Sequence, residues 1–262
     1  MSKICDKFRR FLFLSYCSKT KINFLIFAIN KLFHKSYGIQ REQLFLMSDG
    51  VKIFTGLKSG AGICQIYLDS VYNIYKKFEP TDDSVVIDVG AFVGTFSLKT
   101  AVKNKNVKII AIEPSPKNFA FLEKNVQING STNVLPIQCA LSNFDGEALL
   151  YVSSGDPSLD SLERKVSENT VVVPVYKLDT LIGELGIDAG KVSLVKMDAE
   201  GSEMKILEGA TQLLKSRNVM FIIVAEHAPD EEKILSSFLE KNNFKTCIFR
   251  SKNEVIVYAK KS

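Results

Sequence analysis

The stretch that decides the fold is Val86–Ile87–Asp88–Val89–Gly90–Ala91–Phe92–Val93–Gly94–Thr95. An apolar run ends in an aspartate, and the small residues Gly90, Ala91 and Gly94 follow before a helical pattern begins. Small residues let the backbone turn sharply and come close to a ligand. In a parallel sheet covered by helices, ligands bind beyond the carboxyl ends of the strands. The stretch therefore predicts an α/β fold with a ligand site at the end of its first main strand.

Beyond this stretch, apolar strand patterns alternate with helical patterns. Strands are predicted at 84–88, 107–112, 133–137, 191–197, 219–225, 244–249 and 254–259. Helices are predicted at 95–104, 116–129, 203–216 and 230–242. This alternation, with continuous apolar strands, is typical of a mostly parallel sheet with helices on both faces. The link between the last two strands is so short that we expect them to pair antiparallel.

The region 139–183 interrupts this alternation. It contains two further predicted strands, Glu147–Val152 and Val171–Tyr176, which flank the polar loop Ser153–Asp160. Insertions at such an edge often shape a substrate pocket, so we expect this region to contribute to the acceptor pocket.

The N-terminal part differs in charge from the rest. Residues 1–41 carry nine Lys or Arg and one Asp, a net charge of +8, whereas the remainder carries −3. Apolar residues at helical spacing predict two amphipathic helices in this arm. Its helices either cap the main domain or lie on an anionic membrane surface. Neither apolar run is long enough to span a membrane, and the core site lacks the basic residues of a nucleic-acid channel.

Between the arm and the main domain, a hairpin is predicted at Leu44–Met47 and Val51–Phe54, and a helix at Asp69–Phe78. A polar break follows, and we place the domain boundary there. Residues 1–80 then form the helical extension and hairpin, as a cap, a membrane-surface segment or an acceptor-binding segment. Residues 81–262 form the main domain.

The five cysteines are scattered, without the close spacing of a zinc site or a redox motif. They are Cys5, Cys17, Cys64, Cys139 and Cys247. This pattern fits buried free thiols in a reducing compartment. We therefore expect a cytoplasmic protein, with peripheral membrane contact through the arm as the alternative.

The second strand of the main domain ends in Glu113, 25 residues after Asp88. A carboxylate at that position can accept hydrogen bonds from both hydroxyls of a ribose. The dinucleotide fingerprint G-x-G-x-x-G fits no register here, and a glycine-lysine phosphate loop is absent from the sequence. A ribose without a pyrophosphate matches S-adenosylmethionine better than NAD. An NAD(P)-dependent oxidoreductase and a catalytically silent cofactor-binding module remain the alternatives.

A second charged stretch, Lys196–Met197–Asp198–Ala199–Glu200–Gly201–Ser202–Glu203, also follows an apolar strand. Asp198 and Glu200 lie where the strand turns, and we expect both to reach the cleft and take part in catalysis. Lys196 alternates with Asp198 along the strand, so it is expected on the same face, either in an ion pair or as an acceptor contact. Glu203 opens the next helix, where its charge favours the helix dipole.

The following strand ends in Glu226–His227. A histidine at this position can act as a general base or contact the acceptor. We expect no metal. The alternatives are a metal site formed by Asp198, Glu226 and His227 that holds an acceptor diol, and a loop histidine without a catalytic role.

From Ser84 to Tyr258 the chain resembles FkbM-type methyltransferases, a class I S-adenosylmethionine-dependent group. The segments that carry the resemblance are VVIDVGAFVGTFSL, IEPSPKNFAFLEKNVQING, CALSNFDG, VPVYKLDTL, VKMDAEGSEMKILEGA and IIVAEH. The resemblance implies a Rossmann-like class I methyltransferase fold, a seven-stranded mostly parallel sheet whose last strand is antiparallel. It also implies methylation of a hydroxyl on a sugar or secondary metabolite, so the expected partner is a small-molecule or glycan acceptor.

The resemblance also implies which residues bind S-adenosylmethionine. Those expected near its methionine end are Asp88, Gly90, Ala91 and Gly94, and Phe92 and Asp198 are also expected to bind the cofactor. Glu113 would hold the ribose beside Pro114, and Ala140 and Leu141 would lie near the adenine. The sequence leaves the oligomeric state open.

Overall fold

The computed structural model describes residues 42–56, 63–68, 79–153, 157–225, 227–250 and 254–261. The helices predicted within 1–41 and at 69–78 lie outside these ranges, so the proposed roles of the arm and the domain boundary stay predictions. None of the helices in the described part is long and apolar enough to cross a membrane.

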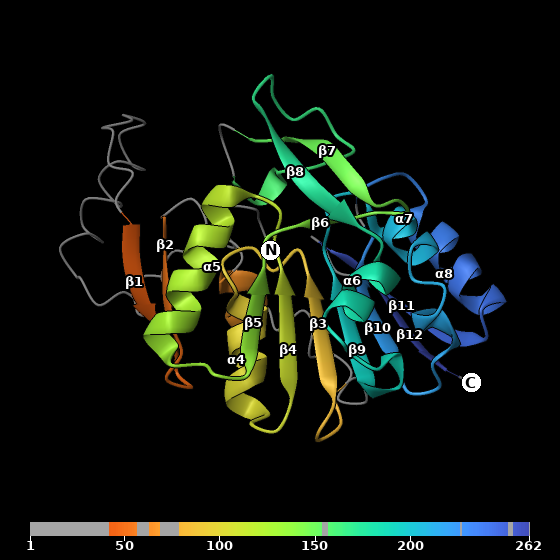
Figure 1. Cartoon of the computed structure of the whole chain (residues 1–262), viewed down its shortest axis with the longest axis horizontal. Coiled ribbons are helices and arrows are strands. Elements are labelled where there is room, and N and C mark those ends of the chain that lie inside the picture. Colours follow the sequence, from red (N-terminus) through yellow and green to blue (C-terminus); the bar gives the residue numbers. More distant parts are fainter. Residues whose placement is uncertain are drawn as a thin grey trace.

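A seven-stranded sheet forms the centre of the fold, in the order β11-β12-β10-β9-β3-β4-β5 (Figure 1). Its strands are β3 (Val85–Val89), β4 (Lys108–Ile112), β5 (Val134–Ile137), β9 (Val192–Met197), β10 (Met220–Val224), β11 (Phe244–Arg250) and β12 (Val255–Lys261). The last strand, β12, is antiparallel to both of its neighbours, whereas the pairs from β10 to β5 are all parallel. The predicted fold class is confirmed, and the predicted strands differ from these by only one or two residues at most ends.

The central strands are buried because helices cover both faces of the sheet. Every residue of β3, β9 and β10 is buried, as their apolar sequences require. Ile87 and Val89 pack with residues of α6 (Leu178–Glu184), α7 (Glu203–Glu208) and α8 (Glu231–Lys241). Val86 packs on the opposite face, with residues of α4 (Thr95–Lys103) and α5 (Pro116–Asn129). Since side chains alternate along a strand, Asp88 shares the face of Val86.

The helix predicted at 203–216 is wrong in its second half. Helix α7 ends at Glu208, and a short 3₁₀ turn follows at Leu213–Lys215. The reason is tertiary: a Cβ on Gly209 would lie 2.3 Å from the carbonyl oxygen of Ser142. The chain therefore passes another backbone at this point, and only glycine allows so close an approach.

A second, three-stranded sheet has the order β6-β8-β7. It consists of β6 (Ala140–Leu141), β7 (Gly146–Tyr151) and β8 (Thr170–Tyr176). The two extra strands predicted in the region 139–183 are thus present, and Figure 1 shows them beyond the carboxyl ends of the central strands. Helix α6, at the end of the same region, was missed, because seven residues show too little helical periodicity to stand out.

The predicted hairpin is present as β1 (Glu42–Leu46) and β2 (Lys52–Gly56), paired antiparallel. It packs on α5, where asparagine side chains bind its backbone. The amide of Phe54 donates to Asn125 Oδ1 at 2.7 Å, and the amide of Lys52 donates to Asn129 Oδ1 at 2.8 Å. The hairpin therefore lies directly against the main domain.

The structure describes the side chains of Cys139 and Cys247, and Cys139 is a free thiol. Cys139 is buried, but Cys247 is exposed because β11 is the edge strand of the sheet. The expectation that the thiols are buried is wrong for Cys247.

Candidate active site

A cavity lies at the carboxyl ends of β3, β4 and β9. Ten of the predicted site residues line it: Gly90, Ala91, Phe92, Glu113, Pro114, Ala140, Leu141, Lys196, Asp198 and Glu200. The structure therefore brings both charged strand ends of the sequence into one wall. Asp88, Gly94 and His227 are not part of this wall.

Other lining residues carried no recognisable signal in the sequence. They include Gln65, Phe96, Asn118, Cys139, Ser158, Asp160 and Leu162. Cys139 and the last three belong to the region 139–183 that was expected to shape the pocket. The remaining three reach the cavity because of how separate elements pack.

The loops that follow β3 and β9 are in direct contact. The amide of Asp198 donates to the carbonyl oxygen of Val89 at 3.1 Å. Gly90 has a φ of +69°, and a Cβ there would lie only 1.9 Å from the carbonyl oxygen of Asp198. Glycine is therefore required at this position, and the two loops form one wall of the cavity.

Asp88 and Lys196 form a buried ion pair beneath this wall. They are register partners in β3 and β9, and Lys196 Nζ lies 3.1 Å from Asp88 Oδ1. Ser97 Oγ donates to Asp88 Oδ2 at 2.6 Å, and Lys196 Nζ donates to the carbonyl oxygen of Gly90 at 2.8 Å. Of the roles considered for Lys196, the structure shows the ion pair. Asp88 thus ties β3, β9 and α4 together and supports the cavity from below.

Glu113 lines the cavity from the end of β4 and is held by backbone amides. Phe92 N–H donates to Glu113 Oε2 at 2.8 Å, and Ser115 N–H donates to Oε1 at 3.1 Å. Burial raises the pKa of Glu113 to about 7, and these hydrogen bonds oppose the rise only in part. The carboxyl group therefore changes its charge near neutral pH.

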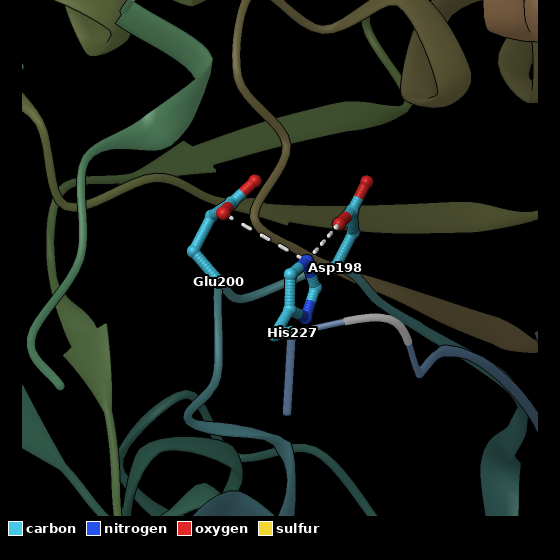
Figure 2. A group of neighbouring side chains, drawn as sticks. All are labelled: Asp198, Glu200 and His227. Carbon is cyan, nitrogen blue, oxygen red and sulfur yellow. Dashed lines mark ion pairs between the residues drawn. The ribbon is translucent and has the colours of Figure 1, made fainter. Parts of the chain in front are cut away.

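Asp198, Glu200 and His227 form a cluster beside the cavity (Figure 2). Figure 2 shows both carboxylates facing the same ring nitrogen, and His227 Nε2 lies 3.7 Å from both Asp198 Oδ1 and Glu200 Oε2. The three meet because β9 and β10 are parallel neighbours that end side by side. Arg164, from the segment between β7 and β8, forms an ion pair with Glu200.

Glu203 has a larger role than the helix-dipole interpretation assigned to it. Its carboxylate accepts the amide of Ala199 at 2.7 Å and the amide of Gly201 at 2.9 Å, so it holds the turn between β9 and α7. His227 Nδ1 lies 3.2 Å from Glu203 Oε1. The sequence held no signal for the histidine contact.

Glu203 and His227 influence each other's pKa. Burial favours the neutral form of both groups, but the mutual contact outweighs it. As a result the pKa of Glu203 is lowered, with the amide of Ala199 contributing, and the pKa of His227 is raised, with Asp198 and Glu231 contributing. Glu231 also accepts the backbone amide of His227 at 2.8 Å, a contact that the sequence did not indicate.

The metal set considered from the sequence included Glu226, which lies outside the described residues. Among the described residues, the group with metal-ligand spacing at the cavity is Asp198, Glu200 and His227. Here Glu200 stands in the place that the sequence analysis gave to Glu226.

The family comparison covers this site. Residues 88–246, more than half of the chain, match the model of the methyltransferase FkbM domain. The chain belongs to the FkbM methyltransferase domain family. The predicted resemblance is therefore confirmed, and with it a methyltransferase domain of the kind that uses S-adenosylmethionine. Membership gives no support to the alternative of an NAD(P)-dependent oxidoreductase.

Individual relatives of this FkbM domain point the same way. It is 31% identical over 169 residues to the hexuronic acid methyltransferase AglP of Haloferax volcanii, a match that covers 64% of this chain and 66% of AglP. It is 28% identical over 164 residues to methyltransferase 1 of Beauveria bassiana, covering 55% of this chain and 64% of the relative. The chain thus spans somewhat less than two thirds of the length of these relatives.

A solved structure shows the same fold. The methyltransferase FkbM of Methylobacillus flagellatus KT superimposes with a TM-score of 0.56 at 16% identity, over 71% of this chain and 46% of that one.

Proposed function

We propose that this FkbM domain transfers a methyl group from S-adenosylmethionine to a hydroxyl oxygen of a sugar or a secondary metabolite. The observation that carries the proposal is the single cavity that joins Glu113 and the Gly90 loop to the Asp198 loop. One end of this cavity has groups suited to an adenosine, and the other has groups suited to an alcohol.

The residues present fit the cofactor. The buried carboxyl group of Glu113 faces the cavity and can accept hydrogen bonds from ribose hydroxyls. Gly90 leaves the backbone open to close approach, and Ala140 and Leu141 offer a buried apolar wall for a base. When bound, S-adenosylmethionine supplies a methyl group attached to a sulfonium sulfur. The sulfur keeps the electron pair of the broken bond and leaves as a neutral thioether.

The chain itself must orient the acceptor and remove its proton. Alignment of the reacting groups is worth about 7–11 kcal/mol in favourable cases. A group that accepts the proton of the acceptor adds roughly 10²–10⁴-fold. The cluster of Asp198, Glu200 and His227 lies where both tasks can be performed, because Asp198 and Glu200 line the same cavity as Glu113.

The charge of the cavity wall favours an uncharged acceptor. Among the described lining residues, the acids are Glu113, Asp160, Asp198 and Glu200, and the base is Lys196, which is already paired with Asp88. An acceptor with its own carboxylate would be repelled by this wall. We therefore favour a neutral sugar or polyol hydroxyl, although AglP by its name acts on a hexuronic acid.

The test has two stages. Isothermal titration calorimetry with S-adenosylmethionine and with NAD should show binding of the first only. Transfer of a labelled methyl group into neutral glycan and lipid extracts should then give a labelled ether. Cofactor binding without any transfer would favour the silent binding module, and a failure to bind S-adenosylmethionine would overturn the proposal.

A further inference from the structure

Thr95, the first residue of α4, carries a buried hydroxyl group at the cavity. The residue is only 4% exposed, and its Oγ1 has no hydrogen-bond partner among the described residues. Most buried polar side chains are hydrogen-bonded, because an unpaired one costs free energy. Since Thr95 belongs to the cavity wall, a ligand bound there can supply the partner that this hydroxyl lacks.

The start of α4 favours a negative charge at the same place. The first hydrogen bond of the helix runs from the amide of Leu98 to the carbonyl oxygen of Gly94 at 2.9 Å, so the amides before Leu98 have no partner within the helix. The first turn has no acidic residue, and Gly94 offers no side-chain cap. Ser97 Oγ donates to Asp88, but Lys196 already neutralises that carboxylate. The positive end of the helix dipole therefore favours a bound anion.

Gln65 reaches the cavity from outside the part of the chain that matches the family model. It is half-buried and lies in the helical turn Cys64–Leu68. Lys99 Nζ donates to the carbonyl oxygen of Ile66 at 2.7 Å, which fixes this turn to α4. Lys99 lies one helical turn beyond Thr95, on the same face of the helix. The amide group of Gln65, which can donate two hydrogen bonds, is therefore on the side of the cavity where Thr95 lies.

S-adenosylmethionine has one anionic group, the carboxylate of its amino-acid end, as well as a cationic ammonium and a sulfonium. The acids of the cavity wall suit the two cations but repel the carboxylate. Among the described lining residues the base is Lys196, which is already paired with Asp88. The carboxylate therefore needs neutral donors, and hydrogen bonds to an ionised acceptor are stronger than those between neutral groups.

We propose that the N-terminal end of α4 binds the carboxylate of S-adenosylmethionine, with Thr95 Oγ1 and the amide group of Gln65 as donors. The inference deepens the proposed function and rests on it. Gly94, which the family resemblance places near the methionine end of the cofactor, directly precedes Thr95. The two assignments therefore agree on which end of the cofactor lies at α4.

Two ligands that differ only in the carboxylate test the proposal in the wild-type chain. Decarboxylated S-adenosylmethionine keeps the sulfonium and the amine but has no carboxylate. Isothermal titration calorimetry should show that it binds at least about tenfold more weakly than S-adenosylmethionine. Equal affinities would overturn the inference and leave the proposed function intact. Failure of both ligands to bind would instead overturn the proposed function.

Thr95→Val removes the hydroxyl and keeps the shape of the side chain. The affinity for S-adenosylmethionine should fall about tenfold, whereas that for the decarboxylated compound should not change. Thr55, in β2, provides a matched control: its Oγ1 is also buried without a partner among the described residues, but it is not part of the cavity wall. Thr55→Val should leave both affinities unchanged. In Thr95→Val, equal losses for the two ligands, or no loss for either, would overturn the role of Thr95.

Urea denaturation separates cofactor binding from a structural role of Thr95. Because its Oγ1 bonds to none of the described residues, Thr95→Val should not lower the free energy of unfolding of the cofactor-free chain. At the same concentration of S-adenosylmethionine, the wild type should gain more stability than the variant, since ligands stabilise in proportion to their affinity for the folded state. A variant that is less stable without cofactor, and gains as much from it as the wild type does, would overturn the proposal.

Gln65→Leu tests the second donor. It should weaken the binding of S-adenosylmethionine and not that of the decarboxylated compound, because only the first has the group that the amide binds. Gln127→Leu, at an exposed position of α5, is the control and should change neither affinity. If Gln65→Leu leaves the preference for S-adenosylmethionine as it is in the wild type, Gln65 is not a ligand of the carboxylate.

Discussion

Glu113 and Glu203 are two buried glutamates at the same edge of the central sheet, and each accepts two backbone amides. Their pKa values nevertheless move in opposite directions. The pKa of Glu113 rises to about 7, whereas that of Glu203 is lowered. The difference is the imidazole of His227, which lies 3.2 Å from Glu203 and has no counterpart among the described contacts of Glu113.

The comparison shows that two amide hydrogen bonds do not by themselves keep a buried carboxylate ionised. A positive partner is needed as well. The cavity wall therefore has in Glu113 an acid that can change charge, whereas the pKa of Glu203, in the turn between β9 and α7, is lowered by its contact with His227.

The largest expected effect on stability comes from removing the ion pair that lies beneath both ends. Lys196→Met leaves Asp88 buried without its positive partner, which should cost about 3–5 kcal/mol in the free energy of unfolding. Urea denaturation of the cofactor-free chain measures this loss.

A matched control uses a more exposed pair. Lys177 lies 3.9 Å from Asp145, and both side chains are more than two-fifths exposed. Lys177→Met should therefore cost no more than about 1 kcal/mol. Equal losses in the two variants would show that the Asp88–Lys196 pair does not support the cavity.

The next effect concerns Glu113 as the ligand of the ribose. Glu113→Ala removes charged hydrogen bonds worth about 1.5–3 kcal/mol, so the affinity for S-adenosylmethionine should fall about 10- to 100-fold. Calorimetry measures the change. Glu123→Ala, on the exposed face of α5, should leave the affinity as it is, and an unchanged affinity in Glu113→Ala would count against the ribose assignment.

The smallest expected effect on cofactor affinity is its pH dependence, which distinguishes Glu113 from Glu203. Because ribose hydroxyls donate to the ionised carboxylate, cofactor affinity should rise roughly tenfold from pH 6 to pH 8, as Glu113 loses its proton near pH 7. Calorimetry across this range in Glu113→Gln should show a flat profile. A tenfold change that persists in this variant would assign the titration to another group.

The stability of the cofactor-free chain should change with the opposite sign. The folded state raises the pKa of Glu113 from 4.5 to about 7, so it binds this proton more tightly than the unfolded state does. This contribution is complete below pH 4.5 and is lost as pH rises to 7, a decrease of about 3 kcal/mol. Denaturation curves of Glu113→Gln lack this contribution, so the wild type and the variant should diverge between these pH values.

The sequence predicted the sheet well because its central strands are buried on both faces, which produces continuous apolar runs such as Met220–Val224. Short or interrupted elements were harder. Helix α6 is too short to show a period, and α7 ends where the backbone of Gly209 meets Ser142. Local residue preferences therefore indicate neither the presence of α6 nor the end of α7.

In the site, too, the features at strand ends were predicted, and those that depend on tertiary packing were not. Residues that follow strands, such as Glu113 and Asp198, were predicted because parallel strands end at one edge. Their partners were not. Arg164, Glu203 and Glu231 reach the cluster from separate elements, so their contacts depend on packing that no motif spacing records.

The contact between Gly90 and the backbone of Asp198 has a consequence for how this family can diversify. Under the proposed function the donor and acceptor ends share this one wall, so neither can be reshaped without disturbing the other. The segment 157–169, which supplies Ser158, Asp160 and Leu162 to the cavity, contacts the Asp198 loop through side chains, with Arg164 paired to Glu200 and Ser161 Oγ donating to the carbonyl oxygen of Glu200. Grafting that segment from a relative is the route by which acceptor preference could be exchanged while the methyl-donor half is kept.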